Sequence, residues 1–351
     1  MNSSFTPDYQ RIAAAAQNRE TSPFPLYEHS INRKIISELT GKDLDSLYDS
    51  RDRQSLRDLF SIIADFHIAY GYDAYSFEGC FTELIQGGEG LLGRAPSIIT
   101  DQRSFETYPW DTLEDRYFDR FAIYFEAIKE TLPQGMKIIG GVGNGVFETI
   151  QDFVPFTELA YLQVDHLELF NALWVKLGDT LLNIWKRFLS EYGDILAVGR
   201  FGDDLGFKSA PLLNPTVISE HIIPQYKKII DTIHRSRKPF LLHSCGCIFP
   251  VMEEIIEIAG IDAKHSNEDV IAPFSTWVEE YGDRIGNFGG FDMDVVCRSS
   301  VSEIRDYIIQ TLEPLQGKRG IAVGTGNQVS DYVPAENFEA MISTVREIRG
   351  Y

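Results

Sequence analysis

The sequence predicts an α/β protein, a (β/α)8 TIM barrel with an N-terminal helical extension. From about residue 70 onward, short apolar runs typical of buried strands alternate with amphipathic runs typical of helices. The alternation recurs eight times, and strands joined through helices pair in parallel with right-handed crossovers. Such a barrel can exceed about 250 residues as one domain, so the 351 residues of this chain do not require two domains. No Gly-x-Gly-x-x-Gly follows the first predicted strand, which disfavours a doubly wound dinucleotide-binding sheet.

The predicted elements share simple signatures. The strands are short apolar runs that end in polar or glycine-rich sequence, at residues 72–77, 136–140, 159–164, 195–198, 239–242, 261–264, 285–288 and 320–323. The helices repeat apolar residues at spacings of three and four, at residues 117–130, 167–192, 218–237, 248–260, 273–282, 301–315 and 335–349. Asn214-Pro215 is typical of a helix start, and Gly260 and Gly282 are typical of helix ends.

Residues 1–69 precede this alternation and look helical at 30–39, 44–48 and 56–69. No Gly/Ser-rich or Pro-rich linker follows them. We therefore expect residues 1–69 to form an extension packed on the barrel of residues 70–351. Residues 79–110, which include Gln86-Gly87-Gly88-Glu89-Gly90, form a long excursion after the first strand, where barrels usually meet their substrates.

Composition excludes several classes of function. Lys and Arg number 32 against 52 Asp and Glu, a formal charge of -20, whereas nucleic-acid grooves and anionic membranes select basic patches. No run approaches the about 18 apolar residues that span a bilayer. Four cysteines are too few for a disulfide framework, and residues 1–7 lack a secretion signal. The sequence favours a cytoplasmic protein with a small-molecule substrate, without nucleic acid or membrane.

His243 and Cys245 are the most informative residues. They end the predicted strand at residues 239–242, and side chains two apart on a strand face the same way. An imidazole and a thiol that point together suit zinc, which prefers Cys sulfur and His nitrogen.

Other polar residues also follow predicted strands, where barrel enzymes place their chemistry. They are Glu78, Asn144, Asp203, Asp204, His265, Glu268, Asp292 and Asn327. We predict Asp203 and Asp204 to be catalytic, as general acid/base or substrate anchor, although adjacent carboxylates on a strand end point oppositely, so that one of them faces the site. Asn144, His265, Asp292 and Asn327 are predicted to bind substrate. For Asn144 and Asn327, the alternative to substrate binding is that the side chain stabilises a turn.

Four glycine-containing motifs add to this pattern. They are Gly202-Asp203-Asp204-Leu205-Gly206, Leu242-His243-Ser244-Cys245-Gly246, Gly289-Gly290-Phe291-Asp292, and Gly324-Thr325-Gly326-Asn327 followed by Pro334-Ala335-Glu336-Asn337. With them, roughly residues 60–351 resemble the uroporphyrinogen decarboxylase superfamily, and within it the cobalamin-dependent methyltransferases that act with corrinoid proteins. The resemblance implies a single barrel with an N-terminal helical extension. Decarboxylases of this family carry an arginine-rich N-terminal segment, whereas Arg11, Arg19 and Arg33 are scattered here.

In the methyltransferase branch, the resemblance implies zinc held by the His-x-Cys pair and by a second cysteine near the eighth strand. Thr325 stands at that second position, and a hydroxyl is a poor zinc ligand. A third ligand must come from the same face of the barrel, and Glu78 is the preferred candidate. Cys80, His265, Glu268 and Cys297 are alternatives. Cys247 is expected to be structural.

Three functions stay open at this point. The first is a zinc-dependent methyltransferase that transfers a methyl group to or from a corrinoid protein or a small-molecule acceptor, with methylcobalamin supplied by the partner. The second is a lyase of the uroporphyrinogen decarboxylase type that acts on a carboxylated substrate without metal. The third is a non-catalytic barrel that binds a ligand. Metal content separates the first from the others.

Overall fold

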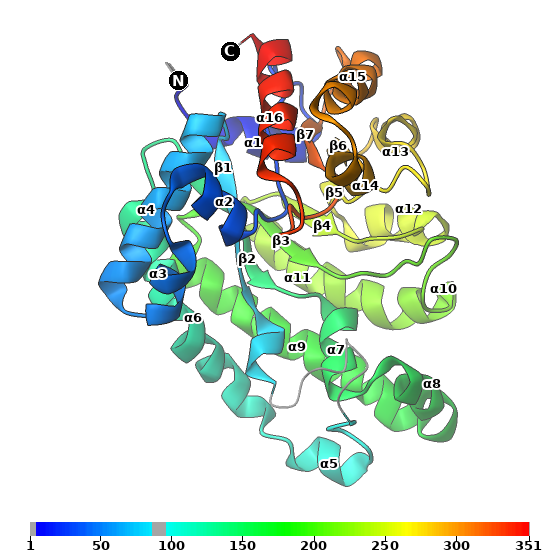
Figure 1. The fold of residues 1–351 in the computed structure, drawn as a ribbon. Coiled ribbons are helices and arrows are strands. Elements are labelled where there is room, and N and C mark those ends of the chain that lie inside the picture. Colours follow the sequence, from blue (N-terminus) through cyan, green and yellow to red (C-terminus); the bar gives the residue numbers. More distant parts are fainter. Residues whose placement is uncertain (1–4, 86–95, 351) are drawn as a thin grey trace.

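In the part of the chain that the structure describes, seven parallel strands form the centre of the fold and curl part of the way round a barrel (Figure 1). The computed structural model describes residues 5–85 and 96–350. The strands hydrogen-bond to one another in chain order. They are β1 Ala74–Cys80, β2 Lys137–Gly143, β3 Leu196–Gly202, β4 Phe240–His243, β5 Ala263–His265, β6 Gly286–Phe291 and β7 Ile321–Thr325. The predicted α/β barrel class is confirmed.

Helices connect the strands and cover the outside of the sheet (Figure 1). Before β1 lie α1 Tyr9–Ala16, α2 Arg33–Thr40, α3 Leu44–Ser50 and α4 Arg53–Tyr70. After it come α5 Gln102–Thr107, α6 Leu113–Thr131, α7 Val146–Phe153, α8 Phe156–Asp165, α9 Leu167–Tyr192, α10 Pro215–Val217, α11 Ile223–Arg235, α12 Met252–Glu254, α13 Phe274–Tyr281, α14 Met293–Arg298, α15 Val301–Leu312 and α16 Ala335–Arg349. Residues 86–90, part of the predicted excursion, lie outside the described residues.

The predicted strand at residues 159–164 is wrong, because this stretch belongs to helix α8. Leu159 and Leu162, three apart, are buried on one face of the helix, while Tyr161 and Val164 are exposed at 61% and 81%. A short apolar run cannot be assigned to strand or helix by its composition alone. β2 pairs directly with β3, so the sheet has no place for a strand between them.

The chain before the barrel occupies the gap between β7 and β1. The Tyr27 amide donates to the Val323 carbonyl, and the Val323 amide donates to the Pro25 carbonyl, each at 2.9 Å. On the other side, Ser76 Oγ of β1 donates to the Glu28 carbonyl at 2.6 Å. Residues 25–29 therefore take the position that an eighth strand would fill.

Helix α1, which the sequence analysis did not predict, closes the N-terminal end of the barrel. Ile12, Ala15 and Ala16 pack with the small and branched residues that line the barrel interior. The Tyr9 amide donates to the Gly135 carbonyl just before β2. Helix α1 therefore fills the barrel at its N-terminal end. Barrel enzymes place their sites at the opposite end, where the strands finish.

The predicted helix boundaries have local causes. Asn214 Oδ1 accepts from the Thr216 amide at 2.9 Å and so caps α10, as expected of Asn-Pro. Gly260 adopts a φ of 82°, in the left-handed region that favours glycine at a helix end. Among the described helices, none has the length and apolarity that a membrane crossing needs.

Candidate metal site

The site lies where β3, β4, β5 and β7 end. His243 is the last residue of β4, and Cys245 follows it by two positions. Asp204 comes two residues after β3, and Asn327 two residues after β7. Because parallel strands end on the same side of the sheet, their polar side chains converge at the C-terminal face of the barrel.

Asp204, His243 and Cys245 form a compact group. His243 Nε2 lies 3.4 Å from Cys245 Sγ and 3.7 Å from Asp204 Oδ1. All three possible ligand atoms lie within 4.8 Å of one another. The Cys245 amide also donates to Asp204 Oδ1 at 2.8 Å, which fixes the carboxylate beside the sulfur. The structure thus brings the predicted His-x-Cys pair together and adds Asp204, which was predicted as a catalytic residue, as the third member.

Two glycines allow the loops that carry these residues to meet. Gly246 has a φ of 82°, and a Cβ on it would lie 2.2 Å from the Gly206 backbone. A Cβ on Gly206 would in turn lie 2.7 Å from the Cys247 amide nitrogen. No other residue type fits at this distance. The close contact gives a physical reason for the glycine that ends each of the two motifs.

Polar groups surround the Cys245 sulfur. Asn327 Nδ2 donates to it at 3.3 Å and Ser266 Oγ at 3.6 Å. Burial raises the pKa of the Cys245 thiol, and the negative charge of Asp204 raises it further, while the Ser266 hydrogen bond opposes the shift. Asn327, predicted to bind substrate, therefore contacts the candidate metal ligand.

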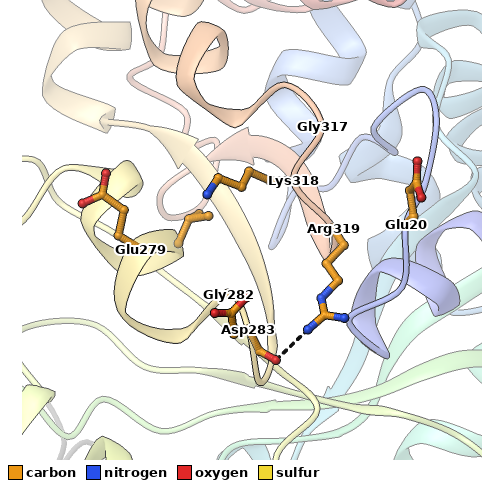
Figure 2. A pocket seen from close by; sticks show the side chains of 8 residues that line it. Glu20, Glu279, Gly282, Asp283, Gly317, Lys318 and Arg319 are labelled. Atoms are coloured by element: carbon orange, nitrogen blue, oxygen red, sulfur yellow. Dashed lines mark hydrogen bonds between the residues drawn. The ribbon is translucent and has the colours of Figure 1, made fainter.

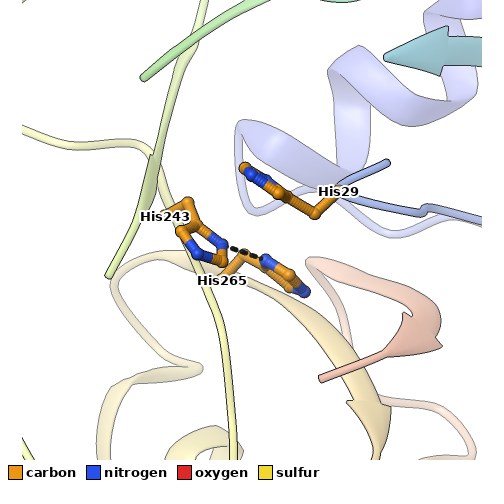
Figure 3. Close-up of side chains that lie close together, drawn as sticks. All are labelled: His29, His243 and His265. Carbon is orange, nitrogen blue, oxygen red and sulfur yellow. Dashed lines mark hydrogen bonds between the residues drawn. The ribbon is translucent and has the colours of Figure 1, made fainter. Parts of the chain in front are cut away.

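The ring of His243 also lies together with two other histidine rings, those of His29 and His265 (Figure 3). His243 Nδ1 lies 2.7 Å from His265 Nδ1, and the ring of His29 stacks on that of His243 with centroids 3.8 Å apart. His265, predicted to bind substrate, is fully buried and also contacts the Thr325 carbonyl through Nε2 at 2.9 Å. Burial lowers the pKa of His265 to about 3 and that of His243 well below its usual value. Both imidazoles are neutral at physiological pH.

Asp203, predicted to be catalytic, holds a helix instead. Its carboxylate accepts from the Phe147 and Glu148 amides at 3.0 and 2.7 Å, and from Tyr226 Oη at 2.5 Å. The first two donors are the free amides of the first turn of α7, which a carboxylate satisfies well. The side chain is fully buried, and the group of Asp204, His243 and Cys245 does not include it.

Two further predicted substrate residues also serve local structure. Asn144, with a φ of 67°, accepts from Thr82 Oγ1 at 3.1 Å and donates to Glu148 Oε2 at 3.1 Å. Asp292 caps α14 by accepting from the Asp294 amide, and its other oxygen accepts from the Asp269 amide.

Glu78, the preferred third ligand, is placed elsewhere. Its Oε1 accepts from Arg200 Nε at 2.6 Å in a buried ion pair, so its charge is already neutralised. Among the described residues, the groups of three possible ligands contain neither Glu78 nor the alternatives Cys80, Glu268 and Cys297. Asp204 replaces Glu78 as the candidate, because the loop after β3 comes close to the end of β4.

The Thr325 hydroxyl has hydrogen-bond partners other than the sulfur. It contacts the Glu28 carboxyl group and the Asn327 carbonyl, and the Thr325 amide donates to Glu28. Burial raises the pKa of Glu28 to about 8. The position that the family resemblance assigned to a cysteine is therefore used to hold the N-terminal segment.

Sequence reasoning missed four residues at this site. Glu148 accepts from the Asp204 amide at 3.1 Å, and burial raises the pKa of its carboxyl group well above its usual value. Ser266 contacts the sulfur, and its place directly after His265 at a strand end was a usable signal. Buried Lys264 donates to the Ser266 carbonyl, and burial lowers its pKa to about 7. His29 comes from the N-terminal segment, where nothing local indicates a site.

The spacing of the three groups fits zinc. Sulfur at about 2.3 Å and nitrogen at about 2.0 Å from a tetrahedral ion lie about 3.5 Å apart, and nitrogen and oxygen ligands about 3.4 Å apart. The observed separations of 3.4 and 3.7 Å are close to these values. The Asp204 side chain is 43% exposed, so solvent reaches this group of three residues. The three-histidine group fits less well, because stacked rings cannot both direct their in-plane lone pairs at one ion.

A surface cavity of about 400 Å³ lies at the other end of the barrel (Figure 2). Gly282 and Asp283 precede β6, and Gly317, Lys318 and Arg319 precede β7. Arg319 donates to the Asp283 carbonyl at 2.9 Å, and charges of both signs line the cavity. It shares no residue with the group around His243.

Comparisons with known proteins agree with this architecture. The structure is similar to a methyltransferase from Methanosarcina mazei, with a TM-score of 0.73 and 15% identity over 98% of this chain and 99% of that one. It is also similar to a putative vitamin-B12 independent methionine synthase from Listeria monocytogenes, with a TM-score of 0.52 and 14% identity over 93% and 98%. At these identities the likeness shows the fold. A search of the curated proteins found no match. The sequence model of the family described as uroporphyrinogen decarboxylase (URO-D) matches residues 93–348, and the chain therefore belongs to that family.

Proposed function

We propose that the protein is a zinc-dependent methyltransferase in which Asp204, His243 and Cys245 hold the metal. The observation that carries the proposal is the convergence of one oxygen, one nitrogen and one sulfur within 4.8 Å at the C-terminal face of the barrel. These are donor types that zinc takes in proteins. Membership of the URO-D family and the likeness to a methyltransferase over nearly the whole chain support the proposal.

The residues of the chain would prepare this chemistry. Zinc with one open position would lower the pKa of a bound thiol, so that a thiolate forms near neutral pH. Asn327 and Ser266 donate to the Cys245 sulfur and so favour its thiolate form. His243 is neutral, so its imidazole nitrogen could bind zinc without adding a positive charge to the site. Partly exposed Asp204 leaves the group accessible to a small molecule.

We propose that the partner is a corrinoid protein, which would present methylcobalamin at this face as the methyl donor, or reduced, unmethylated cobalamin as the methyl acceptor. The methyltransferase branch that the motifs resemble supports this partner. A small molecule such as a thiol would be the other reactant. A protein partner would dock at the barrel mouth, since Asp204 opens to solvent there.

A lyase that acts on a carboxylated substrate is the second candidate, and the description of the family favours it. Such a substrate needs cationic groups at the site. Two cationic side chains at the site are buried and already engaged. Arg200 donates to Glu78 and to Tyr27 Oη. Lys264 donates to the Ser266 carbonyl. This arrangement favours methyl transfer over the lyase.

The zinc content of the purified protein tests whether the proposed site binds the metal. Elemental analysis of the purified wild type should give about one equivalent of zinc, and the His243→Ala variant should give almost none. His234→Ala is the control and should match the wild type, because His234 pairs with Asp262 and belongs to neither group of possible ligands. Equal traces in all three proteins would contradict the proposal.

Demethylation of methylcobalamin in the presence of small thiols, followed by absorbance, tests the reaction itself. The wild type should accelerate it, and removal of zinc with a chelator should abolish the acceleration, since the thiolate no longer forms readily. A zinc-loaded protein that leaves methylcobalamin unchanged while releasing carbon dioxide from a carboxylated substrate would favour the lyase.

A further inference from the structure

The hydrogen bonds around His265 determine where its proton lies. His265 Nε2 is 2.9 Å from the Thr325 carbonyl oxygen. A carbonyl oxygen only accepts, so His265 Nε2 carries a hydrogen. The Thr325 carbonyl is itself held in place, because the amide and hydroxyl of the same residue contact Glu28.

The second nitrogen of His265 faces another imidazole. His243 Nδ1 and His265 Nδ1 lie 2.7 Å apart, so one proton is shared between them. A doubly protonated His265 would be a buried cation whose partners are a carbonyl and an imidazole rather than a carboxylate. The guanidinium of Arg200, which donates to the His29 carbonyl at 2.9 Å, already places a positive charge near these rings and disfavours a second one. His265 is therefore neutral, and its Nδ1 accepts.

We propose that His265 is a positioning residue that fixes the tautomer of His243. His243 then carries its proton on Nδ1 and presents an unprotonated Nε2 to Cys245 and Asp204, 3.4 and 3.7 Å away. A metal can bind only the nitrogen that lacks a proton, and the hydrogen bond of the other nitrogen decides which one that is. The consequence for zinc rests on the proposed function, whereas the tautomer does not.

Two further contacts keep the rings in this arrangement. The ring of His29 stacks on His243 with centroids 3.8 Å apart and an interplanar angle of 23°. The ring of Tyr27 meets that of His265 edge-on at 4.9 Å. Both residues belong to the N-terminal segment in the gap between β7 and β1. The segment thus restrains the two imidazoles as well as filling the sheet.

The tautomer can be read directly in the full-length, zinc-free protein labelled with 15N-histidine. The chain has seven histidines, and the His243→Ala spectrum assigns the signal of interest. Long-range 1H–15N correlation at neutral pH should show His243 protonated at Nδ1 and unprotonated at Nε2. Protonation at Nε2 of His243 in the wild type would overturn the inference.

The variant His265→Phe removes the acceptor and keeps a ring of similar size. We expect His243 to shift toward the Nε2–H form and zinc affinity, measured by competition with a chromophoric chelator, to fall about 10- to 100-fold. His67→Phe is the matched control, because His67 is also buried, with Nδ1 2.7 Å from the Ile63 carbonyl on α4. It should change neither the tautomer nor the affinity.

The two proposals fail separately. If His243 shows Nδ1–H but the wild type binds no zinc, the proposed function is wrong and the role of His265 stands. If zinc binds but His265→Phe leaves the tautomer of His243 unchanged, the role of His265 is wrong and the zinc site stands.

Discussion

Asp203 and Asp204 are adjacent in sequence but have different environments. Asp203 is fully buried and satisfies the first amides of α7, whereas the Asp204 side chain is 43% exposed beside His243. Successive side chains at a strand end point to opposite sides, which explains the division. A Cβ on Gly145 would lie 2.3 Å from Asp203, so α7 begins directly against that carboxylate.

Exchange of each aspartate for asparagine should separate metal binding from stability. Asp204→Asn removes a charged ligand, and we expect zinc affinity to fall about 100-fold or more, since loss of a supporting group alone costs about 10- to 100-fold. Asp203→Asn places an amide N–H against amide donors, and the free energy of unfolding should fall by about 1–3 kcal/mol with zinc affinity retained. Chelator competition and urea unfolding measure the two effects. The reverse pattern would contradict the assignment.

Helix α8 shows how one element is assigned by its neighbours. Leu159 and Leu162 are both buried. They are three positions apart, a spacing that puts two side chains on the same face of a helix but on opposite faces of a strand. Because β2 and β3 are already paired, the run has no strand to join.

The helical register of α8 predicts unequal effects of two similar truncations. Leu162→Ala should lower the free energy of unfolding by about 2 kcal/mol or more, because it opens space in the core. Val164→Ala, at a position 81% exposed, should change it by less than about 0.5 kcal/mol. Equal losses in urea unfolding would indicate a strand-like environment for both side chains.

The N-terminal segment depends on a buried carboxyl group. Glu28 is 4% exposed and contacts the amide and hydroxyl of Thr325. Burial raises its pKa from 4.5 to about 8 in the folded protein. The folded state therefore retains a proton that the unfolded state releases between these pH values. Its contribution to stability is complete below pH 4.5 and is lost as the pH rises through about 8.

Glu28→Gln should remove this pH dependence, because the amide resembles the protonated acid. Between pH 5 and pH 8 the wild-type free energy of unfolding should decline relative to the variant, by at most about 1.4 kcal/mol per pH unit. Urea unfolding at several pH values measures the difference. Glu38→Gln, at an exposed glutamate of α2, is the control and should follow the wild type. Parallel profiles for wild type and Glu28→Gln would contradict the raised pKa.

Most of the barrel could be predicted from the sequence, because strand–helix alternation depends on local periodicity. Seven of the predicted strand positions coincide with β1 to β7. The place of residues 25–29 beside β7 could not be predicted, since the bridge between Leu26 and Val323 joins opposite ends of the chain. Helix α1 was missed for the same reason: what buries its short apolar face is the interior of the distant barrel.

The site could be predicted only in part. His243 and Cys245 are two apart on one chain segment, so their joint direction follows from strand geometry. Asp204 as their partner depends on the contact between Gly206 and Gly246, which links two separate loops. Two other contacts have no local signal in the sequence: the ion pair of Glu78 with Arg200 and the stacking of His29 on His243. Each joins residues over a hundred positions apart.

The molecule as a whole assembles one candidate metal site from four strand ends and the N-terminal segment. β3 and β4 supply the possible ligands, β5 and β7 supply the groups that contact them, and residues 25–29 restrain the imidazoles. An ion bound only by the folded protein stabilises the whole fold, by about 2.7 kcal/mol at a free concentration 100 times the dissociation constant.

Chelation should therefore lower the melting temperature of the wild type. His243→Ala should melt at the same temperature with and without chelator, because it lacks a ligand. Differential scanning calorimetry at fixed pH measures both proteins. A shift of equal size in the two would mean that zinc acts at another place.

X-ray absorption at the zinc edge of the purified protein tests the proposed ligand set most directly. We predict one sulfur at about 2.3 Å with the remaining neighbours nitrogen or oxygen at about 2.0–2.2 Å, and loss of the sulfur signal in Cys245→Ser. Two sulfur neighbours, or a zinc environment unchanged in Cys245→Ser, would contradict a site built from Asp204, His243 and Cys245.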